Sequence, residues 1–272
     1  MGGGIPILRP LTSCLAANEL SQVTGILNGT TNYILTRMIQ AGLTFGQALE
    51  EAQAKGYAER DPSADVDGHD ACRKICILAA LAFGRHVYPD QVETQGIRAV
   101  TLEDAGYAAS QGYQIKLLGR AIRQLEGRVM AFVAPHLVPG GNPLSGVEDV
   151  FNAVVLRGNA TGEVMFYGRG AGELPTASAC VADVMEALQA SPRREEIGWS
   201  PDSAGFEDPL DLQTRYYFRI EGSLADAAMA FGQVEVLSED GETAFLTDPI
   251  TGRDAQRQSR SLNVLSCMRV LA

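Results

Sequence analysis

The spacing of apolar residues predicts that helices dominate the first part of the chain. The expected helices occupy residues 5–18, 30–38, 44–56, 67–84 and 101–110. Glycines at 2–4 lead into the first helix, and one strand is expected at 20–27. Thr30 or Thr31 follows an Asn-Gly turn and can cap the second helix, while Thr44 and Gln47 form a capping box for the third.

The middle of the chain changes from helical to strand periodicity. Residues 113–123 and 128–138 predict a hairpin around Glu126 and Gly127, and further strands are expected at 150–156 and 163–167. A glycine-rich segment then opens a helix over about 174–190. A run of adjacent strands after a run of helices predicts an α+β fold, with a mixed sheet covered by helices.

The last part of the chain predicts a small separate unit. Residues 191–211 are rich in proline, glycine and charge, which is typical of a linker. The segment from 212 to 272 follows the order βαββαβ, the layout of a ferredoxin-like domain. About 60 residues bury little surface on their own, so we expect this unit to dock on the domain at 1–190.

Composition narrows the class of protein. The chain has 272 residues, a net charge of -11 and 46% hydrophobic residues, so it can bury large cores and is poorly suited to nucleic acid or anionic membranes. We find no signal peptide and no long apolar run, and the five cysteines form no CxxC pair. We expect a cytoplasmic protein with reduced thiols. His69, Cys72 and Cys76 could share a helix face, but three ligands favour core packing over zinc.

The densest group of charges is the segment at 52–74. Five carboxylates precede one lysine, namely Glu59, Asp61, Asp65, Asp67, Asp70 and then Lys74. Calcium is excluded, because an EF-hand alignment on Gly68 puts Lys74 at the position of the bidentate glutamate. One reading is a capped helix, with Asp67 as N-cap and a surface pair of Asp70 and Lys74. The other is a cluster in which the lysine moves a proton and the carboxylates orient a substrate.

Two further segments carry weaker signals. Thr30 and Thr31 at a helix N-terminus could receive a small polar ligand or form only a capped turn. Residues 168–172 resemble a phosphate-binding loop but lack the GxGxxG order. From the residues alone, neither segment can be assigned as a ligand site.

The segment at 52–74 resembles the signature of homoserine dehydrogenases. It matches at Gly56, Tyr57, Asp61, Pro62, Asp65, Gly68, Asp70 and Lys74. The resemblance continues in GGGIPI at the start, GILNGTTNYIL at 25–35, FNAVVLRGNATGEVMFYG at 151–168 and GAGELPTASACVADVM at 170–185. It covers about residues 2–190. The segment from 212 resembles an ACT domain more loosely, because its first turn reads EGSL instead of Asp-Arg-Pro-Gly.

The resemblance implies the interconversion of aspartate semialdehyde and homoserine by hydride transfer with NAD(P). Lys74 corresponds to the family lysine that handles the proton of the substrate hydroxyl. The implied substrate-binding positions are Glu59, Asp65, Asp70, Thr30, Gly56 and Tyr57. Gly170 corresponds to a loop close to the nicotinamide, and the backbone carbonyls of Met1, Gly3 and Ile5 to a site for Na⁺ or K⁺. A homodimer is also implied.

The resemblance begins after the family's N-terminal Rossmann domain. We therefore expect a chain that lacks the nucleotide-binding fold and is inactive alone, because the positioned cofactor supplies the hydride. The preference for NAD or NADP would lie in that domain. The competing hypothesis is a non-catalytic oligomerisation or amino-acid-binding module.

Overall fold

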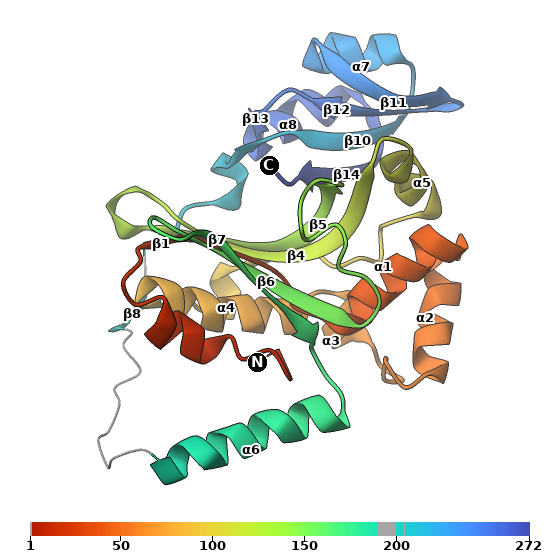
Figure 1. Ribbon diagram of the computed structural model, residues 1–272. Coiled ribbons are helices and arrows are strands. Elements are labelled where there is room, and N and C mark those ends of the chain that lie inside the picture. The colour runs from red at the N-terminus through yellow and green to blue at the C-terminus, as the bar shows by residue number, and fades with distance from the viewer. Residues whose placement is uncertain (1, 190–199, 204) are drawn as a thin grey trace.

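One mixed sheet of ten strands connects most of the molecule (Figure 1). The computed structural model describes residues 2–189, 200–203 and 205–272. The body contributes β1 (Leu20–Ile26), β3 (Glu93–Thr94), β4 (Tyr113–Arg123), β5 (Val129–Pro139), β6 (Phe151–Gly158) and β7 (Gly162–Arg169). The strand order is β11-β12-β10-β14-β5-β4-β1-β6-β7, with β3 beside β5. This confirms the expected mixed sheet with helices against it.

The predicted hairpin is the longest antiparallel pair of the sheet. β4 and β5 pair from Tyr113 opposite Pro139 to Arg123 opposite Val129. The turn needs left-handed backbone at Glu126 (φ 58°) and Gly127 (φ 73°), which glycine adopts without steric cost. The glycine in the sequence therefore located the turn correctly.

The helices of the first part form a layer on this sheet, in which three contact strands directly and two pack on other helices. They are α1 (Gly29–Ala41), α2 (Phe45–Ala54), α3 (Ser63–Val66), α4 (His69–Phe83) and α5 (Leu102–Ser110). The apolar side of α4 joins the β4 core: Ile75 is fully buried, and a Cβ atom added at Gly119 would lie 3.2 Å from the Ile75 Cβ. The capping boxes at Thr44 and at Thr101 are both present.

Three predicted helix starts differ from the structure. The first helix is only a short π-helical segment, Pro10–Cys14, in which the amide of Leu15 donates to the carbonyl of Pro10, and Cys14 is exposed. The cap of α1 is Asn28, whose side chain accepts from the Thr31 amide, so the prediction of Thr30 or Thr31 was wrong. Asn28 has extended backbone, as N-cap residues do.

Asp67 is not the cap of α4. Gly68 occupies that position with φ 84°, and it makes no side-chain cap. The Asp67 carboxylate instead pairs with Arg98, 2.5 Å from its Nε. The acidic segment also contains the short helix α3, where we expected only loop. His69, Cys72 and Cys76 all lie on α4 at i, i+3 and i+7, but His69 is exposed while both cysteines are buried.

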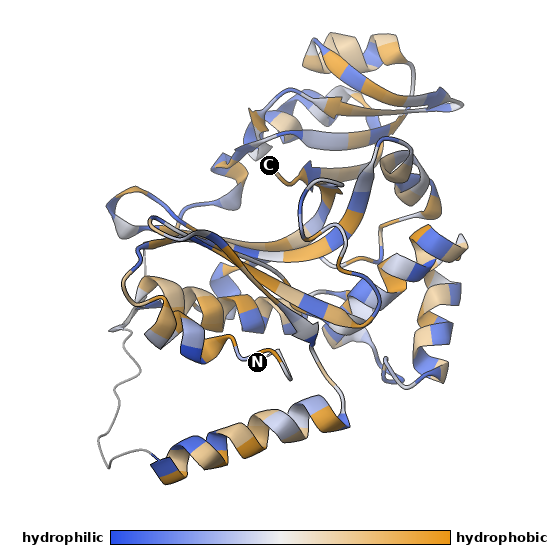
Figure 2. Cartoon of the chain, viewed as in Figure 1, coloured by the Kyte–Doolittle hydropathy of each residue, from blue (hydrophilic) through white to orange (hydrophobic). Residues whose placement is uncertain are grey.

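Helix α6 (Glu173–Gln189) begins where the sequence predicts and has no buried residue. Its large apolar side chains are 54% to 82% exposed, and they are Leu174, Val181, Val184, Met185 and Leu188. Figure 2 shows this apolar content along the helix. Arg9 ties the helix to the start of the chain through ion pairs with Asp183 and Glu186. The apolar side of α6 has no partner among the described residues.

The C-terminal unit has the predicted order. It consists of β10 (Tyr216–Glu221), α7 (Leu224–Phe231), β11 (Val234–Asp240), β12 (Glu242–Thr247), α8 (Gly252–Gln258) and β14 (Asn263–Val270). It docks by extending the body sheet, because Arg269 and Val270 of β14 pair in parallel with His136 and Leu137 of β5. Residues 212–272 are called the tail.

Two small sheets complete the fold. β2 (Arg85–His86) pairs with β8 (Ser200–Ser203), and β9 (Gln213–Thr214) pairs with β13 (Ile250–Thr251). The predicted linker therefore contains a short strand, while residues 190–199 and 204 lie outside the described part. Among the described residues no helix is both long and apolar enough to span a membrane.

Candidate active site

The start of α4 brings Asp70 and Lys74 together. The Lys74 Nζ lies 2.7 Å from an Asp70 carboxylate oxygen and 2.9 Å from the carbonyl oxygen of Leu27. The i, i+4 spacing places both side chains on one helix face, as the sequence predicts. The Lys74 side chain is 23% exposed. An ammonium has three donors, so one remains for an external oxygen.

Asn28 joins this pair to a second carboxylate. Its Nδ2 lies 2.7 Å from Asp65 and 2.9 Å from Asp70, and its Oδ1 accepts from the Thr31 amide at 2.9 Å. The three acceptor and donor contacts fix the orientation of the side-chain amide, since exchange of its oxygen and nitrogen would oppose all of them. Asn28 therefore anchors both carboxylates to the N-terminus of α1.

The surroundings of Asp65 disfavour its charge. Burial raises the pKa of Asp65, and the nearby Asp70 charge raises it further, while hydrogen bonds from Asn28 and Thr30 and the charge of Lys74 act in the opposite direction. A half-buried carboxylate of this kind gains from a cation placed beside it. The group can thus receive an ammonium next to Asp65 and an oxygen next to Lys74.

The turn after α2 is fixed to the same place. The Thr30 hydroxyl donates to the carbonyl of Tyr57 at 2.7 Å. Gly56 has φ 74°, which allows the chain to turn sharply after α2. The Tyr57 ring is 43% exposed and packs edge-on against Tyr33, 5.0 Å between centroids. Tyr57 also borders a polar cavity of about 260 Å³ that contains Arg37.

The other acidic residues of the segment serve local structure or face solvent. Asp61 accepts from the amide and hydroxyl of Ser63, and Asp67 pairs with Arg98. Glu59 is exposed, and its backbone carbonyl accepts from Gln53. The structure therefore gathers Asp65, Asp70 and Lys74, and it does not bring the Glu59 carboxylate into their hydrogen bonds.

The glycine turn at the start lies against the Gly170 loop. The amide of Gly4 donates to the carbonyl of Arg169 at 3.1 Å, and a Cβ atom on Gly3 would lie 2.2 Å from the Gly170 carbonyl oxygen. Gly170 in turn has no room for a Cβ atom, because the Asn152 amide would be 2.3 Å away. Met1 lies outside the described residues.

A metal centre built from side chains is not seen in the described part of the chain, where no three His, Cys, Asp or Glu residues cluster suitably. The carbonyl of Ile5 already accepts from the Ile7 amide at 2.9 Å. The predicted backbone cation site therefore stays a prediction.

Asn28 is a residue of the candidate site that the sequence pattern does not single out. The Asn-Gly pair was interpreted as a turn, although asparagine is among the strongest N-cap residues and stands directly before the helix. That signal could have identified the cap. Its second role depends on residues 37 and 42 positions away and is not visible locally.

Comparisons with known proteins show which family the chain resembles. A family model for homoserine dehydrogenase matches residues 6–185. The homoserine dehydrogenases of Synechocystis sp. and Bacillus subtilis are 43% and 39% identical over 91% and 93% of this chain. The chain spans only 61% and 59% of those relatives' own lengths.

Solved structures share the fold of this chain. A homoserine dehydrogenase from Thiobacillus denitrificans superposes with a TM-score of 0.90 at 32% identity, covering 99% of this chain and 68% of that one. A hyperthermophilic archaeal homoserine dehydrogenase mutant in complex with NADPH gives a TM-score of 0.59 at 34% identity, covering 71% and 55%.

Proposed function

The chain belongs to the homoserine dehydrogenase family, and from this premise we propose that Asp65, Asp70 and Lys74 form the substrate side of that oxidoreductase site. The substrates are L-homoserine and L-aspartate semialdehyde. The observation that carries the proposal is the remaining donor of Lys74 beside a carboxylate pair fixed by Asn28. Charge and geometry match a substrate with an ammonium group at one end and an oxygen at the other.

Lys74 is the proposed catalytic residue. Its contacts with Asp70 and the Leu27 carbonyl keep the ammonium in place, so that its third donor can hold the substrate oxygen. In the oxidation direction the substrate hydroxyl proton leaves as a carbonyl forms, and Lys74 assists its movement toward solvent. In reduction, Lys74 donates a hydrogen bond to the aldehyde oxygen and favours its protonation.

Asp65 and Asp70 are the proposed substrate anchors. Asp65 gains from a nearby positive charge because burial raises its pKa, so it suits the substrate ammonium. The adjoining wall is formed by Thr30, Gly56 and Tyr57. The hydrogen bond from the Thr30 hydroxyl to the Tyr57 carbonyl holds it in place. Glu59, in the turn after α2, is a further proposed anchor on the basis of family resemblance alone.

The cofactor is proposed to be NAD(P), which supplies or accepts the hydride when bound. The described residues do not contain a parallel doubly wound sheet, and the tight packing of Gly170 against Asn152 explains that glycine without a cofactor. We therefore infer that most of the nucleotide site belongs to protein outside this structure, and that Gly170 only borders it. The exposed apolar side chains of α6 are the proposed contact for the protein that carries the nucleotide site.

A monovalent cation, Na⁺ or K⁺, is the second proposed ligand. Its proposed ligands are carbonyls of the glycine turn, Gly3 and Ile5, with Met1. The positive φ of Gly3 (52°) makes this turn, and the contact of the turn with Gly170 supports a role near the cofactor.

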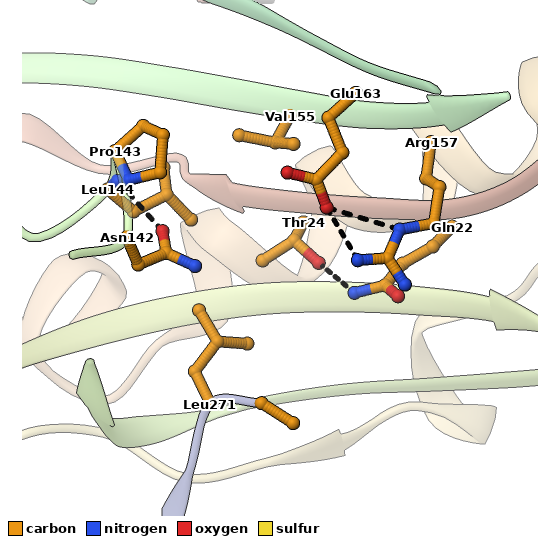
Figure 3. A pocket seen from close by; sticks show the side chains of 10 residues that line it. Gln22, Thr24, Asn142, Pro143, Leu144, Val155, Arg157, Glu163 and Leu271 are labelled. Carbon is orange, nitrogen blue, oxygen red and sulfur yellow. Dashed lines mark hydrogen bonds and ion pairs between the residues drawn. The ribbon is translucent and has the colours of Figure 1, made fainter. Parts of the chain in front are cut away.

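We propose a homodimer formed through the sheet face opposite α4. Figure 3 shows side chains on this face around a cavity of about 30 Å³, with an ion pair between Arg157 and Glu163 and a hydrogen bond between Gln22 and Thr24. Tyr167 on the adjoining strand is 55% exposed. The part of this face that Leu144 and Leu271 do not cover is partly apolar, which favours association. Five free cysteines are compatible with a cytoplasmic location.

The tail is proposed to be a degenerate ACT-like domain. Its element order and antiparallel sheet support this, while the turn after β10 is built by a capping box of Ser223 and Asp226.

Titration calorimetry of the purified chain tests the proposed function. We expect saturable L-homoserine binding that weakens at least about tenfold in Asp70→Asn, because one charged hydrogen bond is worth about 1.5–3 kcal/mol. Asp61→Asn is the matched control, since Asp61 contacts only Ser63. NADPH should not bind, and the chain alone should not oxidise homoserine. Unchanged homoserine binding in Asp70→Asn contradicts the site and favours a non-catalytic module.

A further inference from the structure

A second cavity lies where the tail meets the body sheet. It holds about 270 Å³ and opens beside the parallel contact of β14 with β5. Its walls include Glu93, Gln95, Ala134, Tyr216, Phe218, Gly252, Ala255, Val264, Met268 and Arg269. None of these residues belongs to the candidate active site. Because some of its walls come from the body and the others from the tail, the cavity forms only when the tail is docked.

Arg269 is a buried cation in the wall of this cavity. It is 6% exposed, and its Nε has no hydrogen-bond partner in the described structure. Among the described residues its carboxylate contact is Glu93, at 3.4 Å from NH2, and the Glu93 side chain is 42% exposed. The guanidinium lies 4.7 Å from the centroid of the Phe132 ring. This ion pair is long, so the charge of Arg269 is poorly compensated.

Arg120 adds a second positive charge on the same ring. Its guanidinium lies 5.6 Å from the Phe132 centroid, and the residue is 6% exposed. No described residue accepts a hydrogen bond from its buried Nε. Burial, together with the charges of Arg269 and Arg157, lowers the pKa of Arg120 to about 10. Two buried arginines around one ring, with one distant carboxylate, leave an excess of positive charge.

Tyr216 provides a polar group at the other side of the cavity. The residue is 4% exposed, and its hydroxyl has no partner among the described residues. Burial raises the pKa of Tyr216, while the positive charge of Arg269 acts against that rise. A buried hydroxyl without a partner destabilises the folded protein, and a ligand oxygen that accepts from it would remove that cost.

We propose that this cavity binds a small carboxylate anion. The carboxylate accepts from Arg269 and from the Tyr216 hydroxyl, and it displaces Glu93 from Arg269. The short carbon chain of the ligand packs on Ala134, Phe218 and Val264, which line the remaining wall. Because the walls come from both the body and the tail, an occupant stabilises the docked tail.

Calorimetric titration of the full chain with L-lactate, at constant ionic strength, tests the proposal. We expect saturable binding that weakens roughly tenfold in Arg269→Gln, which removes a charged donor. Glu93→Gln should tighten binding severalfold, because it removes the carboxylate that competes for Arg269. This second variant alters a partly exposed side chain and so decides the matter even if Arg269→Gln does not fold.

The control is Glu235→Gln, the same change in a tail residue whose partner, Arg215, does not line the cavity. It should leave L-lactate binding unchanged. L-Alanine has the same carbon skeleton with an ammonium in place of the hydroxyl, and inorganic phosphate tests for unspecific anions. Absence of saturable L-lactate binding, weaker binding in Glu93→Gln, or preference for L-alanine or phosphate overturns the proposal.

Discussion

Arg219 of the tail donates from its Nε to Asp104 of α5 at 2.8 Å, and both side chains are buried. Tyr217 donates to the same carboxylate oxygen at 2.9 Å. Burial alone lowers the pKa of Arg219, but its hydrogen bonds to Asp104 and Glu242 outweigh burial and raise it. The tail is thus joined to the helical layer by charge as well as by the β14 to β5 pairing.

Asp104→Asn should loosen this junction. Removing one partner of a buried ion pair costs about 3–5 kcal/mol, because the other charge remains buried. Urea unfolding should show that loss, with limited proteolysis releasing the tail first. Glu163→Gln breaks an exposed pair with Arg157 and should change stability by about 1 kcal/mol or less. Equal effects of the two variants would refute the role given to Asp104.

Asn28→Asp tests the bridge between Asp65 and Asp70. The new carboxylate can still cap α1, but it places a third negative charge where the amide donated two hydrogen bonds. Its folded-state pKa should be raised by its neighbours, so the destabilisation should be full near neutral pH and decrease as the pH falls through that raised pKa.

Thermal unfolding of Asn28→Asp and of the parent at acidic and neutral pH measures this difference. Asn28→Ser keeps a capping oxygen without adding a charge. It removes only the hydrogen bond that lowers the pKa of Asp65, so its destabilisation should depend on pH less steeply than that of Asn28→Asp. A pH-independent effect in Asn28→Asp would show that Asn28 acts only as a cap.

Local patterns explain which elements the sequence predicts. Thr44, Thr101 and the glycine at 127 act on neighbours within a few residues, so their capping and turn signals were sufficient. The tail order followed from the same kind of pattern. The fold class and the Asp70 to Lys74 pair were therefore predicted correctly.

Long-range relations could not be predicted in this way. Asp67 looked like a cap because its sequence context fits one, but Arg98, 31 residues away, binds it instead. The continuous sheet depends on two residue pairs between β14 and β5. Asn28 binds Asp65 and Asp70, so these two carboxylates belong to the hydrogen-bonded group and Glu59 does not. An uncharged asparagine is not part of the charge pattern.

Lys116 should make stability depend on pH. It is 1% exposed, its Nζ lies 2.5 Å from the Val147 carbonyl, and burial lowers its pKa to about 8. Below that pH the lysine is charged in both states and the burial cost is complete. Between about 8 and the ordinary lysine pKa of 10.5 only the unfolded chain holds the proton, so stability rises with pH.

The rise can reach about 3 kcal/mol for a shift of this size. Lys116→Met has a similar length and no charge, so the stability of the parent relative to this variant should increase from pH 8 to pH 10. Urea midpoints at several pH values measure it. A constant difference between parent and variant over that range would contradict the lowered pKa.

Gly170→Ala should destabilise the contact between the Gly170 loop and β6. The added methyl group would lie 2.3 Å from the Asn152 amide nitrogen, and Asn152 is 2% exposed, so it cannot move into solvent. Overpacking of this kind costs about 1–3 kcal/mol. Gly46→Ala is the matched control, because nothing lies within 4 Å of its added Cβ and it stands in α2. There alanine should stabilise by about 0.4–1 kcal/mol. The two urea midpoints should therefore shift in opposite directions. A Gly170→Ala midpoint at or above that of the parent would show that Asn152 moves aside without loss of stability.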